Sequence, residues 1–231
     1  MGPVARRFIR LTGLSVGLSL MLFLSGCSLF GWSSKEEEKT PQELMSEGME
    51  YFEGGYYESA TESFQKLKDR YPYSKFAVTA EIKMADSLYR RDLYAEAYDA
   101  YSEFEKLHPR NPEIPYVMYQ RGMCHFKQVT TIDRDQAHTF LAKEEFERLV
   151  KKFPENEYAH RARLKIRKCY IYLAEYELYV ARFYFKQKKY RAAMDRYLYV
   201  LKNYPDLGQY HEALEYLGKC KEKLAEEPKE S

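Results

Sequence analysis

The sequence lacks the patterns that mark most catalytic and metal-binding sites. It has no glycine-rich loop that could cradle a phosphate group, and its five histidines include no pair at metal-ligand spacing. The segment Asp133 to His138 begins like a calcium loop, but the glycine and the closing glutamate of such a loop are missing. No nucleophile stands in a pattern with a base. We therefore expect a protein that is not an enzyme and that needs neither a metal nor a cofactor.

Cysteine is scarce, with four in 231 residues. Cys124, Cys169 and Cys220 are far apart, match no zinc pattern and each fall within a helical pattern. We expect them to fill small buried apolar positions; a disulfide between two of them is the alternative in an oxidising compartment. His125 directly follows Cys124, and we interpret this pair as part of a packing helix and not as a thiol nucleophile with its base.

An excess of positive charge is also absent once the N-terminus is set aside. The formal net charge is +2, and residues 1–26 contribute three arginines and no acid, which leaves −1 for residues 27–231. A protein that binds nucleic acid normally presents a basic face. The composition therefore gives no support to a nucleic-acid partner.

One apolar run, residues 11–24, follows three arginines and is too short to span a membrane. Fourteen helical residues rise about 21 Å, whereas the hydrocarbon core is about 30 Å thick. The run ends in Leu-Ser-Gly-Cys, which resembles a bacterial lipobox whose cysteine receives a diacylglycerol before cleavage. We therefore expect residues 1–26 to be a lipoprotein signal peptide and Cys27 to carry the lipid anchor.

The residues after Cys27 refine this expectation. Residues 27–40 are mostly polar and charged from residue 33 onward, so we expect a flexible tether between the lipid and the folded part. Ser28 stands where an aspartate would suggest retention in the inner membrane, which favours the outer membrane. A short buried helix with an incidental cysteine is the alternative to the whole N-terminal interpretation.

Beyond residue 40, one spacing recurs four times. A small residue is followed by an aromatic residue four positions later, an apolar residue three further on and a proline five beyond that. The spacing resembles the second helix of a tetratricopeptide repeat (TPR), in which the small residue permits close helix approach and the proline ends the helix. The four instances are Ala60-Phe64-Leu67-Pro72, Ala97-Tyr101-Phe104-Pro109, Ala142-Phe146-Leu149-Pro154 and Ala193-Tyr197-Val200-Pro205.

The first helices precede the second helices at a constant spacing, with one exception. Gly48, Ala85 and Ala181 each stand 12 residues before the small residue of the second helix, but Gly122 stands 20 before Ala142. We therefore expect a longer loop in the third repeat. Residues 157–187 contain no glycine or proline, which predicts one or two unusually long helices. The expected repeats are residues 41–74, 78–111, 115–156 and 158–207, followed by a terminal helix at 210–225.

These patterns predict an all-α fold, a TPR-type right-handed superhelix (α-solenoid) of about four to five helix-turn-helix repeats. A single repeat cannot bury its apolar face, but stacked repeats bury a continuous core. Stacking also leaves a curved concave surface, and such surfaces bind peptides and other proteins.

We expect a peptide to lie on the first helices of repeats one to three, at positions that commonly face the groove in such repeats. Most of these positions are apolar or aromatic, and methionine makes such a lining adaptable. The aromatic side chains of a peptide would enter the lining, and its terminal carboxylate would approach Arg90 or Lys127. The alternative is that much of the lining is core between repeats. The predicted lining is Met45, Met49, Phe52, Ile82, Tyr89, Arg90, Tyr116, Tyr119, Met123, Phe126 and Lys127.

Four stretches resemble the BamD (ComL) family of outer-membrane lipoproteins, and together they span almost all of residues 41–205. They are residues 51–77, where Pro72, Ser74 and Ala77 match the family's Tyr-Pro-x-Ser-x-x-Ala turn; the insertion Asp133-Arg134-Asp135; residues 173–193; and Arg196 before YLYVLKNYP. The C-terminus departs from the family, which usually completes a fifth repeat.

The resemblance implies a lipid-anchored subunit of the outer-membrane β-barrel assembly (BAM) complex on the periplasmic face of the outer membrane. It implies that the C-terminal repeats hold a BamA-like barrel subunit through its periplasmic POTRA domains, beside other BAM lipoproteins. It also implies that the N-terminal repeats recognise the C-terminal signals of unfolded outer membrane proteins. Arg196 stands where the family has an arginine linked to the barrel-subunit contact, and a solvated helix charge is the alternative.

Two other classes of function stay open at the level of sequence. One is another envelope TPR lipoprotein, such as a pilotin-like assembly factor or an adaptor for cell division or peptidoglycan. The other is an enzyme such as a peptidoglycan-cutting lipoprotein, although no residue stands out as its catalytic acid.

Overall fold

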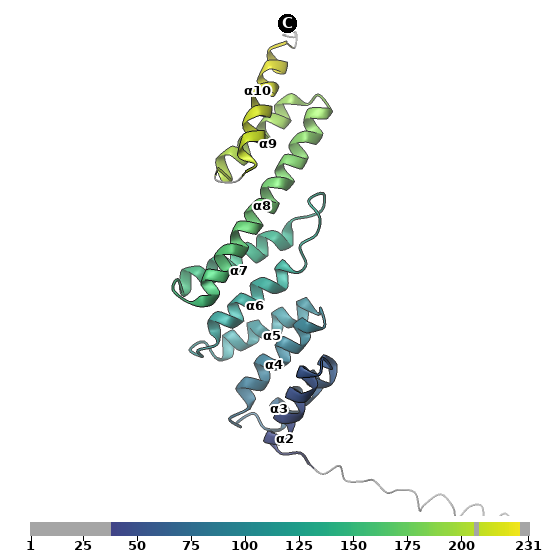
Figure 1. Ribbon diagram of the computed structural model, residues 1–231, viewed down its shortest axis with the longest axis vertical. Helices are drawn as coiled ribbons and strands as arrows, with labels where there is room; N and C mark the ends of the chain where they lie inside the picture. Colours follow the sequence, from purple (N-terminus) through teal and green to yellow (C-terminus); the bar gives the residue numbers. More distant parts are fainter. Residues whose placement is uncertain (1–37, 206–207, 227–231) are drawn as a thin grey trace, which may run out of the picture. The chain divides into compact units, whose positions relative to one another are not determined.

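The computed structural model describes residues 38–205 and 208–226, and this part of the chain is helical throughout. Each helix packs against the next one along the chain, and α6 also contacts α8 (Figure 1). The expectation of an all-α array of TPR type is confirmed. The helices are α2 (Pro41–Glu53), α3 (Tyr57–Arg70), α4 (Ala77–Arg90), α5 (Tyr94–Leu107), α6 (Ile114–Phe126), α7 (Ala137–Lys152), α8 (Glu157–Lys186), α9 (Tyr190–Asn203) and α10 (Tyr210–Glu226).

The second helix of each pair ends in the same way, because each is followed by an aromatic or histidine residue and then a proline. A residue before proline is sterically excluded from the α region. The four residues have φ between −137° and −124° and ψ between 49° and 62°. This one backbone conformation therefore ends the second helix of every repeat, at Tyr71, His108, Phe153 and Tyr204.

The turn between the two helices of a repeat is also shared by three of the four. Gly55, Asp92 and Lys188 have φ of 80°, 60° and 57°, and each lies five residues before the small residue of its second helix. The left-handed conformation costs glycine little and other residues more. The third repeat replaces this tight turn by residues 127–136, the longer loop that the sequence predicts.

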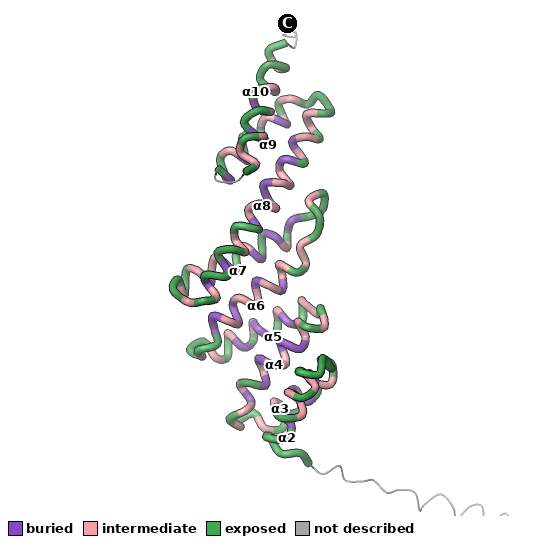
Figure 2. Tube along the Cα trace, viewed as in Figure 1, coloured by how far each residue is buried: buried purple, intermediate pink, exposed green. Residues whose placement is uncertain are grey.

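The recurring triad of small, aromatic and apolar residues forms the core of each repeat. All twelve of these side chains are at most 1% exposed, which confirms the spacing as a packing signal. Figure 2 shows that buried positions recur along each helix and alternate with exposed ones.

The glycines of the first helices explain how the aromatic rings fit. A Cβ placed on Gly48 would lie 2.5 Å from the ring of Phe64, and one placed on Gly122 would lie 2.5 Å from the ring of Phe146. Carbon atoms in contact normally stay about 3.5–4.0 Å apart. The missing side chain is therefore what lets the ring of the second helix approach the first helix.

The three described cysteines are free and buried, as expected. Cys124 and Cys169 belong to a cluster of buried residues from α4 to α8, and Cys220 belongs to a cluster from α8 to α10. Burial raises the pKa of the Cys124 and Cys169 thiols to about 12, so both are neutral near pH 7. They act as small apolar side chains and not as nucleophiles.

The long helix that the sequence predicts is a single one. α8 has 30 residues, and the side chain of Asn156 accepts a hydrogen bond from the backbone N–H of Tyr158 to cap its start. Its first half contributes Ala162 and Cys169 to the cluster around repeats two and three, and its second half contributes Leu173 and Leu178 to the cluster with α9 and α10. α8 therefore joins two cores.

The described helices offer no candidate for a membrane span. Even α8, the longest of them, is not apolar enough over any stretch of the required length. The predicted signal peptide and tether lie outside the described residues, apart from residues 38–40.

Replacing Gly48 with alanine tests the contact with Phe64. Alanine favours a helix over glycine by roughly 1 kcal/mol, but here the added methyl group overpacks the core, which typically costs about 1–3 kcal/mol. We expect Gly48→Ala and Gly122→Ala each to lower the free energy of unfolding, measured by urea denaturation.

Gly218 supplies the matched control, because it lies in α10 with nothing within 4 Å of an added Cβ. Gly218→Ala is expected to raise the free energy of unfolding by roughly 0.5–1 kcal/mol. If all three alanines stabilised the protein equally, close approach to the aromatic ring would not be the reason for the glycines.

Candidate functional site

The predicted groove residues lie on the first helices α2, α4 and α6, apart from Lys127, which directly follows α6, and most of them are half-buried. Ile82 differs, since it is 8% exposed and belongs to the core. Arg90 and Lys127 are exposed. The residues form two sets: those of α2 pack on the cluster of repeat one, and those of α4 and α6 pack on the cluster of repeats two and three.

The aromatic residues of α6 gather with aromatics of α7 and α8. Tyr119 lies with its ring centre 5.6 Å from that of Phe146 and 5.7 Å from that of Tyr158. Phe126 lies 6.3 Å from both Phe146 and Tyr172. These distances are typical of packed aromatic pairs. The rings of α6 are thus shared between the core and the surface, and each is half-buried.

An apolar pocket opens beside Phe126, at the start of the third-repeat loop. Its volume is 360 Å³, within the range of about 300–1,000 Å³ of small ligand sites. The end of α6, the first part of the loop and α8 all contribute to its walls. The pocket is lined by Phe126, Val129, Thr130, Thr131, Ile132 and Tyr172.

Lys165 lies against Phe126 at this pocket, and Lys127 and Lys168 are close enough to Lys165 for their charges to act on it. The Nζ of Lys165 lies 4.4 Å from the centre of the Phe126 ring. Burial, together with the positive charges of Lys168 and Lys127, lowers the pKa of Lys165. Among the described residues, no carboxylate forms an ion pair with any of these three lysines. Unneutralised like charges beside an apolar pocket favour an anion with an apolar group.

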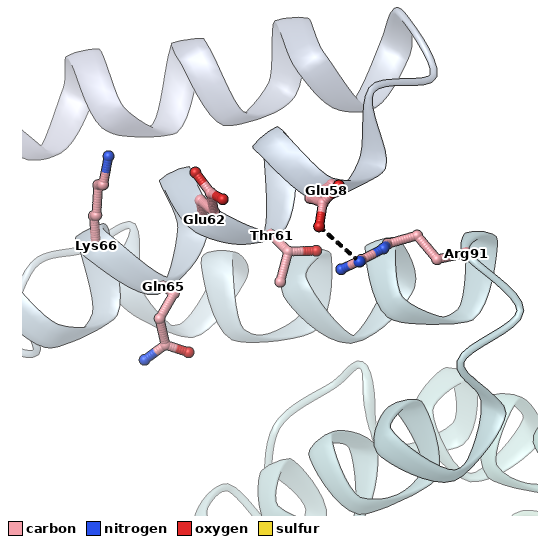
Figure 3. Close-up of a pocket in the computed structure, with 6 residues that line it drawn as sticks. All are labelled: Glu58, Thr61, Glu62, Gln65, Lys66 and Arg91. Carbon is pink, nitrogen blue, oxygen red and sulfur yellow. Dashed lines mark hydrogen bonds and ion pairs between the residues drawn. The ribbon is translucent and has the colours of Figure 1, made fainter.

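A second pocket, between α3 and the end of α4, has a different character (Figure 3). Its volume is also 360 Å³, but its lining is polar and of mixed charge. Arg91 already pairs with Glu58, with Nη2 3.1 Å from Oε1. The cation here is therefore neutralised, and Lys66 and Glu62 add one charge of each sign, so this pocket selects no particular ligand charge.

Asp86 is a buried residue that the sequence patterns do not single out. It is 6% exposed, and its Oδ1 accepts hydrogen bonds of 2.6 Å from the hydroxyls of both Tyr101 and Tyr116. Its Oδ2 lies 3.2 Å from the Nζ of Lys83. Burial and the negative charge of Asp86 raise the pKa of Tyr116 well above its ordinary value. Asp86 thus fixes the hydroxyl of Tyr116 from α4.

A network of two arginines and two glutamates joins α5, α6 and α7. Arg121 donates to Glu105 at 2.6 Å and to Glu145 at 2.7 Å, and Arg148 donates to Glu105 at 2.7 and 2.8 Å. Burial alone would raise the pKa of Glu105, but the hydrogen bonds and charges of Arg148 and Arg121 outweigh it and lower the pKa to about 2. Glu105 therefore stays charged near neutral pH.

Arg196 lies on α9 and is held by an acid of α8. Its Nη1 donates to the Oε2 of Glu177 at 2.9 Å, and this hydrogen bond raises the pKa of Arg196 despite partial burial. The Arg196 side chain is 44% exposed, so part of the guanidinium faces solvent. Cys27, the predicted lipid attachment site, lies outside the described residues.

The paired helices, their common turns and their repeated cores define a protein of the TPR class. A solved TPR protein of Thermus thermophilus aligns with 80% of this chain and 100% of its own length, at a TM-score of 0.43 and 16% identity. That likeness is too distant to add to the argument, and the class rests on the repeats themselves.

The chain belongs to the outer membrane lipoprotein family YfiO, whose family pattern matches residues 37–231. The outer membrane protein assembly factor BamD of Rickettsia prowazekii is 33% identical over 204 residues, which cover 87% of this chain and 80% of that protein. BamD of Neisseria gonorrhoeae is 28% identical over 221 residues, covering 90% of this chain and 83% of its own.

Replacing Glu105 with glutamine tests the ion network. The folded-state pKa lies below the ordinary value of 4.5, so the stabilisation is present above that value and is lost as the pH falls toward 2. We expect Glu105→Gln to lower the free energy of unfolding by about 2 kcal/mol at pH 7, and the difference from the unmodified protein to shrink as the pH falls from 5 to 2. Urea denaturation at a series of pH values measures both effects.

Glu103→Gln is the control on the same helix, because Glu103 is exposed and its nearest lysine Nζ, that of Lys68, is 3.6 Å away. It should change stability by less than about 0.5 kcal/mol. Equal effects of the two substitutions would contradict the assignment of the network as a stabilising feature.

Proposed function

We propose that this chain is a lipid-anchored TPR scaffold of the outer-membrane β-barrel assembly complex. In this proposal it is held at the periplasmic face of the outer membrane, binds the periplasmic domains of a BamA-like barrel subunit beside other BAM lipoproteins, and receives unfolded outer membrane proteins. Membership of the outer membrane lipoprotein family and the similarity to BamD proteins support the assembly role. The observation that carries the substrate-binding part is the pocket beside Phe126, with Lys165 over the Phe126 ring.

The chemistry of this pocket fits the end of a strand-forming chain. Such an end offers an aromatic side chain and a free carboxylate. The apolar walls at Phe126 and Tyr172 suit the aromatic ring, and the ammonium groups of Lys165 and Lys127 suit the carboxylate. A peptide without the carboxylate would leave the lysines without a counter-charge.

The preceding residues of the peptide would extend along the half-buried first helices. Tyr116, Tyr119 and Met123 of α6 and Tyr89 of α4 keep part of their apolar surface exposed. Alternate side chains of an extended peptide point the same way, so every second residue could contact this surface. We leave Ile82 out of this lining because it is buried in the core.

The barrel subunit would bind elsewhere, on the helices that follow. Arg196 is our candidate contact, because Glu177 orients its guanidinium while part of it stays open to solvent. An oriented guanidinium suits a carboxylate on a partner surface.

The peptide site is tested by fluorescence anisotropy with a labelled peptide that ends in phenylalanine and a free carboxylate. We expect Lys165→Gln to weaken binding about tenfold, the effect of losing one charge-assisted contact, and amidation of the peptide to weaken binding to the unmodified protein by a similar factor. Lys151→Gln, on the exposed side of α7, is the matched control and should bind normally. Equal binding of the free and amidated peptides would refute recognition of the carboxylate.

The scaffold role is tested by purifying the tagged chain from detergent-solubilised membranes. A β-barrel protein with repeated periplasmic domains should co-purify, and Arg196→Glu should lower its recovery at least about tenfold. Lys202→Glu, an exposed charge reversal on the same helix, should not.

Thermal unfolding of the Arg196→Glu and Lys202→Glu variants shows whether each is folded, since Arg196→Glu also breaks the pair with Glu177. If no barrel protein co-purified with the unmodified chain, the proposed assembly role would be wrong. A role as another kind of envelope adaptor would then be favoured.

A further inference from the structure

Two histidines that are 13 positions apart in sequence meet in the third repeat. His125 lies near the end of α6 and His138 near the start of α7, and their Nδ1 atoms are 3.4 Å apart. The ring centres are 5.6 Å apart with an angle of 39° between the planes. Both side chains are half-buried, so solvent reaches the pair. Their spacing in the sequence does not indicate this contact, because the loop between the two helices separates them.

The distance between the two nitrogens distinguishes two kinds of contact. Hydrogen bonds from N–H groups typically span about 2.7–3.2 Å, so 3.4 Å is long for an imidazole–imidazole hydrogen bond. Two zinc–nitrogen bonds of about 2.0–2.1 Å at a tetrahedral angle would hold the nitrogens about 3.3–3.4 Å apart. A square-planar ion would need a shorter separation of about 2.9 Å. The observed separation suits a tetrahedral ion.

Neighbouring residues orient His125 before any ligand arrives. Its ring lies against that of Tyr98, with centres 4.7 Å apart. The Tyr98 hydroxyl donates to the Oε1 of Glu145 at 3.0 Å and accepts from the Nη2 of Arg121 at 2.6 Å. The ion network thus fixes Tyr98, and Tyr98 fixes the imidazole.

We propose that His125 and His138 form a two-histidine site for a divalent transition metal of tetrahedral preference, with Zn²⁺ as the best fit. Among the described residues, no group of three or more histidine, cysteine, aspartate or glutamate side chains could hold a metal. The remaining positions on the ion are therefore left to water. The bound ion would link the two ends of the loop at residues 127–136, part of which lines the pocket beside Phe126. The site does not depend on the proposed function.

Titration of the purified full chain with ZnCl₂, followed by calorimetry, tests the site. We expect saturable binding of one Zn²⁺ ion per chain and a rise in the thermal unfolding temperature, with no effect of MgCl₂ because imidazole is a poor ligand for Mg²⁺. Co²⁺ should give the strong visible absorption of a four-coordinate site. His125→Gln and His138→Gln should each weaken Zn²⁺ binding by more than about tenfold.

His160→Gln and His211→Gln are the matched controls, because both residues are exposed on other helices. They should leave the first Zn²⁺ binding event unchanged. Circular dichroism checks that each variant is folded; if His125→Gln loses helix, His138→Gln decides alone. Zn²⁺ binding of unchanged affinity in His138→Gln, or the absence of binding by the unmodified chain, would overturn the proposal.

Discussion

The array depends on one contact that each repeat makes between its two helices. A glycine or alanine of the first helix leaves room for an aromatic ring of the second, and both are fully buried. Gly48 and Gly122 accommodate Phe64 and Phe146 so closely that a methyl group would clash. Alanine at 85 and 181 occurs together with the tyrosines at 101 and 197. Because helices pack at about 8–10 Å depending on their contact residues, this choice sets how closely each pair can approach.

Repeats two and three are joined by polar contacts in addition to apolar ones. Asp86 accepts hydrogen bonds from a tyrosine of α5 and a tyrosine of α6. Glu105 accepts hydrogen bonds from an arginine of α6 and an arginine of α7. Buried polar contacts are directional, so they penalise a slipped register more than apolar contacts do. The same groups hold Tyr98, which packs against His125, and Tyr116 of the predicted groove lining.

Much of the fold could be read from the sequence, because its repeats use the same residue types at the same spacing. The triad, the prolines, the third-repeat loop and the long helix all follow from local steric rules that act within a few residues. The candidate sites were harder to predict. Phe126 and Lys127 were expected at a groove, but Lys165 and Tyr172 come from α8, some 40 positions further on. His125 and His138 meet only because the loop returns the chain. Ile82 was also expected at the groove, but it is buried in the core, because an apolar residue on a first helix can face either side.

The long helix α8 connects the pocket with the C-terminal helices without an interruption. Its 30 residues correspond to a rod of about 45 Å, and neither glycine nor proline interrupts it. Sharp kinks in helices are almost always found at such residues or at local bulges. The first half of α8 packs in the core next to the pocket at Phe126, and its second half packs in the core that contains α9, the helix of Arg196. Lys165 and Tyr172, at the pocket, therefore stand on the same uninterrupted helix as Glu177, which pairs with Arg196.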